Sequence, residues 1–352
     1  MYTGSPVYMF FTMRFYFQSK IIIVLLFLLA IGAFTSACNN NEIQNKPFLE
    51  YPKHFPSPQY PNIQNQVTAA GFELGKMLFY DKNLSLTRTL SCGSCHAQVH
   101  GFADHNVATS FGIFNRQGIR NSPAIMNMAW GKQFMWDGGI NHLDLLPLAP
   151  ITDTTEMGLS INSWIDRITQ QQVKYGPLFR KAFGSDSITE KKILLSLSQF
   201  MLSLVSSNSK YDQVIKGEQN FNPLEAQGYE IFKLKCNSCH TEPLFSNSQF
   251  ERNGYTQSGL DRGRMRITEL PTDLYKFKVP SLRNLEFTYP YMHDGKVQTL
   301  DEVLNHYSNN QLHVQNEKII PLQPAEKEAI TAFLKTLTDY QFISNLKFSE
   351  PR

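Results

Sequence analysis

Apolar residues recur at the spacing of helical turns in several segments of the chain. In the first half, this pattern predicts helices over residues 65–80 and 187–205. Ser187 and Glu190 form a capping-box pattern, which predicts that the second of these helices begins at Ser187. Both helices have one apolar face, so each is expected to pack on a buried core.

The second half repeats this order of elements. Pro223 follows Asn222, and proline at the first helical position predicts a helix that starts here and continues into residue 236. A closing helix is predicted over residues 325–338. Few segments alternate between apolar and polar residues, so the fold class is expected to be mainly α.

The first 37 residues have the pattern of an export signal. Arg14 and Lys20 precede an uncharged run over residues 21–37, and its most apolar part is shorter than the roughly 20 residues of a spanning helix. Small residues and Cys38 follow, as at a bacterial lipoprotein cleavage site. We therefore expect a lipoprotein-type signal peptide over residues 1–37, a lipid on Cys38 and a location in the periplasm or cell envelope. An ordinary cleaved signal and an uncleaved anchor are the alternatives.

The length of the chain predicts the number of domains, and its charge argues against a nucleic-acid partner. A chain of 352 residues is long enough for roughly two domains of about 150 residues each. We expect a tether and lead-in over residues 38–64, a first domain over 65–210 and a second over 211–345. The formal charge is +3, 18% of the residues are charged, and Lys and Arg form no stripe, so nucleic acid is not an expected partner.

Two Cys-x-x-Cys-His strings, one in each half, carry the most specific chemistry. In such a string the two thiols form thioether bonds to a haem, and the following His binds the iron. A four-Cys zinc site is disfavoured because its two pairs usually lie only about 15–20 residues apart, and a disulfide would not explain the two His residues. The strings use four of the five cysteines, so we predict two covalently bound haem c groups, held by Cys92, Cys95 and His96 and by Cys236, Cys239 and His240.

Further motifs lie around these strings. They are Leu74-Gly75, Leu78-Phe79-Tyr80-Asp81, Arg120-Asn121-Ser122-Pro123, Trp136-Asp137-Gly138, Glu156-Met157-Gly158, Val279-Pro280-Ser281-Leu282-Arg283-Asn284 and Pro290-Tyr291-Met292-His293-Asp294-Gly295. With these motifs in this order, the chain resembles the bacterial dihaem cytochrome c peroxidases and their MauG-type relatives over about residues 65–340. The resemblance implies two cytochrome c-like domains, each with one covalent c-type haem.

In that family the N-terminal haem is the peroxide site. The resemblance therefore implies a peroxidatic domain over residues 65–210 and an electron-transfer domain over residues 211–345. Glu156 matches the distal acid, which would move a proton from one oxygen of peroxide to the other. Trp136 matches the indole that lies between the two haems and relays electrons. A surface helix position for Glu156 and a core position for Trp136 are the alternatives.

Two positions near the first haem string depart from the family pattern. Many of these peroxidases cap the iron with a His until reduction releases it, and the corresponding region here reads Ser110-Phe111-Gly112. We therefore expect a peroxide face that is open without prior reduction. His100 and His105 lie nearby in a different register and are weaker candidates for the cap. Leu146 stands where the family commonly carries a distal Gln, so one hydrogen bond to bound oxygen is expected to be missing.

The second haem is expected to have a protein ligand on both faces. Tyr307 aligns with the distal ligand of the MauG-type branch, whereas other peroxidases supply a Met. A phenolate would stabilise ferric iron and lower the reduction potential. His306 and Met292 are the alternative ligands, and packing on the haem edge is the alternative role of Tyr307.

Two further roles involve residues of the same motifs. Asn121 and the backbone carbonyls of Thr288 and Pro290 match the family's interdomain calcium site, and oxygen ligands suit this cation. This site rests wholly on the resemblance. Arg283 and His293 are predicted to neutralise haem propionates, with plain surface positions as the alternative.

The leading functional hypothesis is a membrane-tethered peroxidase that reduces hydrogen peroxide to water. Electrons from a small cytochrome, a cupredoxin or a similar donor would enter at the His240 haem and pass by Trp136 to the His96 haem. One alternative is a MauG-like oxidase that modifies a partner protein, which Tyr307 and the missing capping His favour. Another is a dihaem electron carrier, against which Glu156 argues. The family's peroxidases tend to dimerise, so a homodimer is a further expectation.

Overall fold

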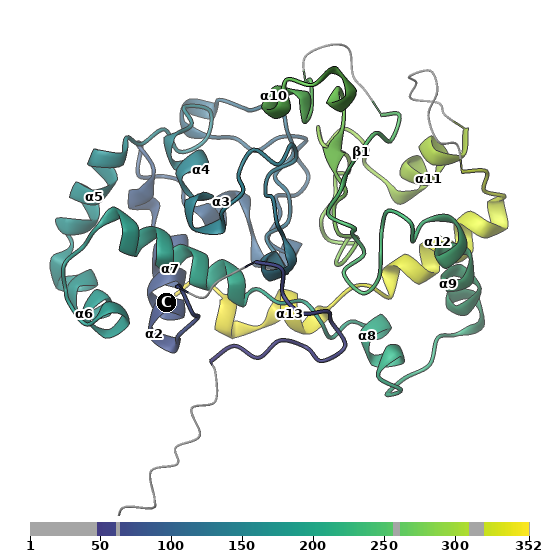
Figure 1. The fold of residues 1–352 in the computed structure, drawn as a ribbon, viewed down its shortest axis with the longest axis horizontal. Coiled ribbons are helices and arrows are strands. Elements are labelled where there is room, and N and C mark those ends of the chain that lie inside the picture. The colour runs from purple at the N-terminus through teal and green to yellow at the C-terminus, as the bar shows by residue number, and fades with distance from the viewer. Residues whose placement is uncertain (1–47, 61–63, 256–260, 310–319, 352) are drawn as a thin grey trace, which may run out of the picture. The chain divides into compact units, whose positions relative to one another are not determined.

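Helices make up most of the regular structure (Figure 1). The computed structural model describes residues 48–60, 64–255, 261–309 and 320–351. The predicted signal peptide and Cys38 lie outside these residues. Within the described ranges, no helix is long and apolar enough to cross a membrane. The prediction of a mainly α fold is confirmed.

The first half is built around the packing of α2 on α7 (Glu190–Ser203). Helix α2 (Ala69–Phe79) also contacts α6 (Gln172–Phe183), and α5 (Ile161–Thr169) packs on α6. Their apolar faces form one core, which includes Phe72, Phe79 and Phe200. Two shorter helices belong to this half, α3 (Cys92–Cys95) and α4 (Leu148–Thr152).

The second half has a smaller core between α9 and α12. Helix α9 (Pro223–Lys235) packs on α12 (Pro324–Lys335), and α11 (Leu300–Asn309) contacts α12. Strands β1 (Phe250–Glu251) and β2 (Phe277–Lys278) pair antiparallel, with Phe250 opposite Lys278. The core includes Phe232, Phe245 and Phe333. Two shorter helices of this half are α8 (Lys210–Ile215) and α10 (Met265–Thr268).

Both helix pairs approach closely at a glycine. A side chain at Gly75 of α2 would overlap the carbonyl of Ser196 in α7, and one at Gly228 of α9 would overlap the carbonyl of Ala329 in α12. The same backbone contact therefore occurs once in each half. This is the arrangement expected of a duplicated domain.

Gly228→Ala is expected to lower the free energy of unfolding by about 1–3 kcal/mol, because the added methyl group would push α9 away from α12. Gln227→Ala is the matched control, since it changes an exposed position on the same helix and should alter stability by about 0.5 kcal/mol or less. Denaturant unfolding of the haem-loaded protein measures both variants. Equal stability of the two would contradict the close packing.

The predicted helices are present, but two of their starts differ. The helix predicted over 65–80 begins four residues later, because Thr68 caps it by accepting a hydrogen bond from the N–H of Gly71. The capping box predicted at Ser187 is wrong, since Thr189 is the residue that caps α7. The start at Asn222 is confirmed by a reciprocal capping box.

The end of the chain returns to the first half. Helix α13 (Tyr340–Ser344) follows α12 and lies near the first half (Figure 1). Phe342 and Phe348 are buried in the first core. The Phe348 carbonyl accepts a hydrogen bond from Tyr80 Oη at 2.9 Å. The first core is thus completed by residues from the C-terminus. The limits of the two domains stay predictions.

The lead-in over residues 48–60 contacts both halves. Phe55 is buried in the first core, and the Arg283 guanidinium lies 4.7 Å from its ring centroid. His54 Nε2 lies 3.0 Å from Asp212 Oδ1. This segment therefore helps to hold the two halves together.

Candidate dihaem site

The first Cys-x-x-Cys-His string forms the helical turn α3 and its C-cap. The backbone N–H of His96 donates to the Cys92 carbonyl at 2.9 Å. His96 Nδ1 donates to the Phe102 carbonyl at 2.8 Å, so Nε2 keeps a lone pair. Burial lowers the pKa of His96, which keeps the ring neutral and able to bind iron. The Cys92 and Cys95 thiols form no disulfide, as thioether attachment requires.

Glu156 lies close enough to this string for its charge to act on both thiols. Burial, and then the negative charge of Asp153, raises the pKa of Glu156 to about 7. Water nevertheless reaches the side chain. Glu156 is thus an exposed carboxyl group near the thiols of this string. At this pKa it can both accept and release a proton near neutral pH.

The loop over residues 110–117 packs on the backbone of Glu156. The N–H of Ile113 donates to the Glu156 carbonyl at 2.8 Å. Ser110, in the region where the resemblance would place a capping His, donates from its hydroxyl to Asp104 Oδ2 at 2.6 Å. The loop contains no His, Met or Cys that could bind iron. The open peroxide face therefore stays the prediction for this site.

The other residues predicted to affect this face have partners of their own. His100 and His105 stack on each other, with ring centroids 3.4 Å apart. Leu146 is buried in the first core. A Gln at that position would have to find hydrogen bonds in an apolar environment.

The second string follows α9 without a break and repeats the arrangement of the first. The backbone N–H of His240 donates to the Cys236 carbonyl at 3.0 Å. His240 Nδ1 faces the carbonyls of Phe245 and Pro280, each at 3.2 Å, which again leaves a lone pair on Nε2. Burial lowers the pKa of His240, so this ring is also neutral.

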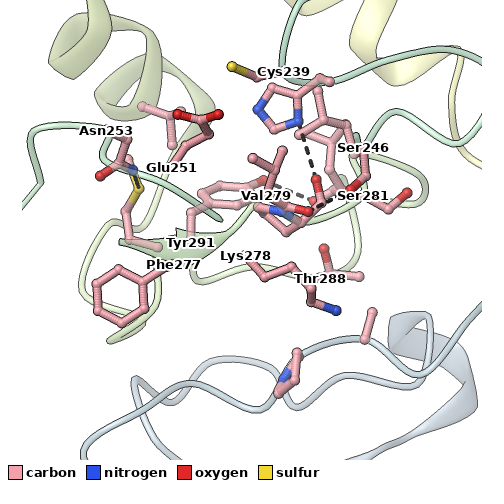
Figure 2. A pocket seen from close by; sticks show the side chains of 18 of the residues that line it. Cys239, Ser246, Glu251, Asn253, Phe277, Lys278, Val279, Ser281, Thr288 and Tyr291 are labelled. Atoms are coloured by element: carbon pink, nitrogen blue, oxygen red, sulfur yellow. Dashed lines mark hydrogen bonds between the residues drawn. The ribbon is translucent and has the colours of Figure 1, made fainter. Parts of the chain in front are cut away.

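A cavity of about 580 Å³ lies beside this string. Apolar side chains of α11 and α12 line it, and polar side chains come from the β1–β2 region, among them Glu251 and Asn253 (Figure 2). Apolar walls next to two thiols and a neutral imidazole fit a covalently bound haem. The apolar residues lining this side are Val303, Leu304, Ile330 and Leu334.

Of the three candidate distal ligands, Tyr307 and Met292 line this cavity, whereas His306 does not. His306 is buried, and its Nε2 donates to the Asn253 carbonyl at 2.7 Å. Burial raises the pKa of the Tyr307 phenol, and a hydrogen bond with the Asn253 side chain opposes the rise. Because burial disfavours the ionised phenol, a phenolate at Tyr307 would need a positive charge beside it. Ferric iron would supply that charge. The geometry therefore favours Tyr307 over His306 as the distal ligand of the second haem.

Trp136 lies where the two halves meet. Its Nε1 donates to the Asn121 carbonyl at 2.8 Å, and its own carbonyl accepts a hydrogen bond from the N–H of Lys278 at 2.8 Å. The side chain also lines the cavity beside His240. Trp136 is therefore bonded to both halves, as a relay between them requires.

Asp137 anchors the Trp136 segment. Its carboxylate accepts hydrogen bonds from Arg120 and Arg266 at 2.7 Å each, and Arg120 also pairs with Asp261 at 2.6 Å. Burial alone would raise the pKa of Asp137, but the charges and hydrogen bonds of the two Arg residues hold it below its ordinary value. These ion pairs fix the segment against the second half.

The three residues of the predicted calcium site line the same cavity. Asn121 Nδ2 donates to the Ala108 carbonyl at 3.1 Å, which leaves Oδ1 as an acceptor. In the described part of the chain, the carbonyl oxygens of Thr288 and Pro290 accept no hydrogen bond. An amide oxygen and two carbonyl oxygens without partners fit a hard cation. The calcium itself stays a prediction.

The predicted propionate role finds no support at Arg283. Its guanidinium is fully buried, pairs with Asp212 at 2.7 and 2.8 Å and donates to the Pro243 carbonyl. Its donors are therefore used inside the fold, by residues that lie far away in the sequence. His293, in contrast, lines the cavity and stacks on Phe277 with ring centroids 3.8 Å apart. Its propionate role stays a prediction.

Known proteins are similar to this chain in sequence and in fold. A family profile described as di-haem cytochrome c peroxidase matches residues 69–220. The cytochrome c551 peroxidase of Nitrosomonas europaea is 37% identical over 275 residues, which cover 76% of this chain and 80% of that protein. This chain belongs to the dihaem cytochrome c peroxidase family.

Other members of the family include MauG-type proteins. The methylamine utilization protein MauG of Methylophilus methylotrophus is 31% identical over 297 residues, which cover 81% of this chain and 86% of that protein. The crystal structure of a MauG-like protein associated with microbial copper homeostasis aligns with a TM-score of 0.77 and 31% identity, over 86% of this chain and 98% of that one. Peroxidases and MauG-type proteins are thus both similar to this chain.

Membership of the dihaem peroxidase family confirms the predicted fold of two cytochrome c-like domains. The family consists of peroxidase-type oxidoreductases, and it implies two c-type haems, a peroxide substrate and a cytochrome electron donor.

Two residues that the sequence analysis missed line the cavity of this family member. Asn253 hydrogen-bonds to Tyr307 through its side chain, and its Nδ2 lies 3.5 Å from Met292 Sδ. No spacing in the sequence points to it. Lys278 directly precedes the Val279-Pro280 motif, but Lys276 lies two residues before it, so the sequence alone does not distinguish the two cations.

Proposed function

We propose that this protein is a cytochrome c peroxidase, which reduces hydrogen peroxide to water with electrons from a small redox protein. The observation that carries the proposal is the Glu156 carboxyl group, with its pKa of about 7, beside the first haem string. When bound, the haems would supply one-electron transfer and the iron at which peroxide is reduced.

Glu156 is proposed to act as both base and acid. Its ionised form takes a proton from one oxygen of hydrogen peroxide, and its protonated form gives that proton to the oxygen that leaves as water. A pKa of about 7 suits both steps, because neither form is strongly disfavoured at neutral pH. The fixed loop over residues 110–117 holds the Glu156 backbone in place.

The remaining residues are proposed to hold the haems and to connect them. His96 and His240 would bind the two irons through Nε2. Tyr307 would be a second protein ligand of the iron at His240, and Trp136 would carry electrons between the halves. Its hydrogen bonds to Asn121 and Lys278 keep the indole in position.

A MauG-like oxidation of a partner protein is the second candidate function. The position of Tyr307 in the cavity favours it, because a phenolate ligand stabilises higher oxidation states of iron. Glu156 argues against a dihaem electron carrier, because a protein that only transfers electrons needs no proton-carrying carboxyl group. Residues 1–38 lie outside the described structure, and we keep as proposals a lipid on Cys38, a location in the cell envelope and a homodimer.

Peroxide turnover with reduced cytochrome c tests the proposed function. We expect turnover both with and without reduction of the enzyme beforehand, and a resting ferric spectrum with mixed high-spin and low-spin iron. Turnover that requires prior reduction would contradict the open peroxide face. Absence of turnover in both cases would reject the peroxidase in favour of the MauG-like reaction or the carrier.

A further inference from the structure

Lys278 places a cation inside the cavity beside His240. It ends strand β2, and its N–H donates to the Trp136 carbonyl at 2.8 Å. Its side chain lines the cavity together with those of Cys239 and His240. Figure 2 shows the side chains of Lys278 and Cys239. Two residues later, the Pro280 carbonyl faces His240 Nδ1 at 3.2 Å. The same short segment therefore contacts the relay residue, the haem ligand and the cavity.

The Lys278 ammonium has no anionic partner in the described part of the chain. Desolvation by burial lowers its pKa to about 8, and no carboxylate opposes this effect. Glu251 lines the same cavity, but no ion pair joins it to Lys278. An ammonium group in such a place is normally paired with a negative charge.

The other cations around the cavity are already engaged. Lys235 pairs with Glu326 at 2.8 Å, and Arg252 Nε donates to a backbone carbonyl. Arg283 pairs with Asp212 and does not line the cavity. Among the Lys and Arg residues that line the cavity in the described ranges, Lys278 is thus the one available to neutralise an anion that enters this space.

We propose that Lys278 pairs with a propionate carboxylate of the haem attached at Cys236 and Cys239. This inference deepens the proposed function, because it assumes the haem at His240, but it does not depend on peroxide turnover. The pair would connect that haem to the segment whose backbone is bonded to Trp136. It would also give the haem a positive neighbour, which disfavours the ferric state relative to the ferrous state.

Spectroelectrochemical titration of the two haems tests the pairing. Lys278→Met removes the charge and keeps much of the side chain, and Lys278→Arg keeps the charge. Lys276→Met is the matched control, since Lys276 lies nearby, pairs with Asp273 at 3.2 Å and does not line the cavity. Each variant is first shown to carry two covalent haems, and Lys278→Gln replaces Lys278→Met if that variant does not assemble.

In Lys278→Met we expect the ferric-to-ferrous ratio of the low-spin haem to rise about tenfold at a fixed potential, which for one electron corresponds to about 59 mV. Lys278→Arg and Lys276→Met should leave the ratio within about twofold of the parent, about 18 mV. An unchanged ratio in the neutral Lys278 variant that assembles would overturn the pairing, and so would an equal shift in Lys276→Met. A shift in a protein without peroxidase activity would reject the proposed function and keep the pairing.

Discussion

Glu156→Gln is expected to lower peroxide turnover by about 10²–10⁴-fold while both haems stay attached. The amide keeps the size of the side chain but cannot take a proton from peroxide. The same change should remove the rise of turnover with increasing pH. Because burial raises the pKa of Glu156 to about 7, the ionised base forms as the pH rises through this value, and turnover should rise with it.

Asp153→Asn provides the control for this effect. Its charge is the second cause of the raised pKa, so its removal should move the rising limb to lower pH without abolishing turnover. Steady-state rates between about pH 5 and pH 9, on protein with equal haem content, measure both variants. If Glu156→Gln retains the parent's rate and pH profile, Glu156 is not the proton carrier.

Tyr307→Phe is expected to change the low-spin haem signal and to raise the reduction potential of that haem by on the order of 0.1 V. The phenol oxygen is the only atom removed, and a phenolate ligand would stabilise the ferric state. Electron paramagnetic resonance and a redox titration measure the two effects. The first haem should keep its spectrum, because its string lies in the other half.

Tyr291→Phe is the matched control for Tyr307→Phe. Tyr291 lines the same cavity, but its hydroxyl donates to the Leu285 carbonyl at 3.0 Å. We expect an unchanged low-spin signal in this variant. An unchanged signal in Tyr307→Phe would exclude Tyr307 as the ligand and would direct attention to Met292.

Local patterns in the sequence predicted the helices and the two haem strings well. Apolar periodicity reports which face of a helix meets a core, and both strings are contiguous, so neither depends on distant residues. The predicted start of α7 was wrong because Ser187 and Thr189 are both good N-cap residues. Only the path of the chain before the helix decides between them.

Partners that lie far apart in the sequence could not be predicted. The role of Arg283 depends on Asp212, which lies in α8. The choice between His306 and Tyr307 depends on the rotation of α11, since neighbouring residues of a helix point about 100° apart. His306 faces Asn253 and Tyr307 faces the cavity. No spacing within the helix specifies which side meets a haem.

The return of the C-terminus to the first core has a consequence for the order of events during synthesis. Phe342 and Phe348 complete a core that contains α2, and the Phe348 carbonyl bonds to Tyr80, shortly before the first string. A chain made from its N-terminus cannot complete this core until the residues after α12 have been added. A truncation after α12 would therefore damage the half that was made first.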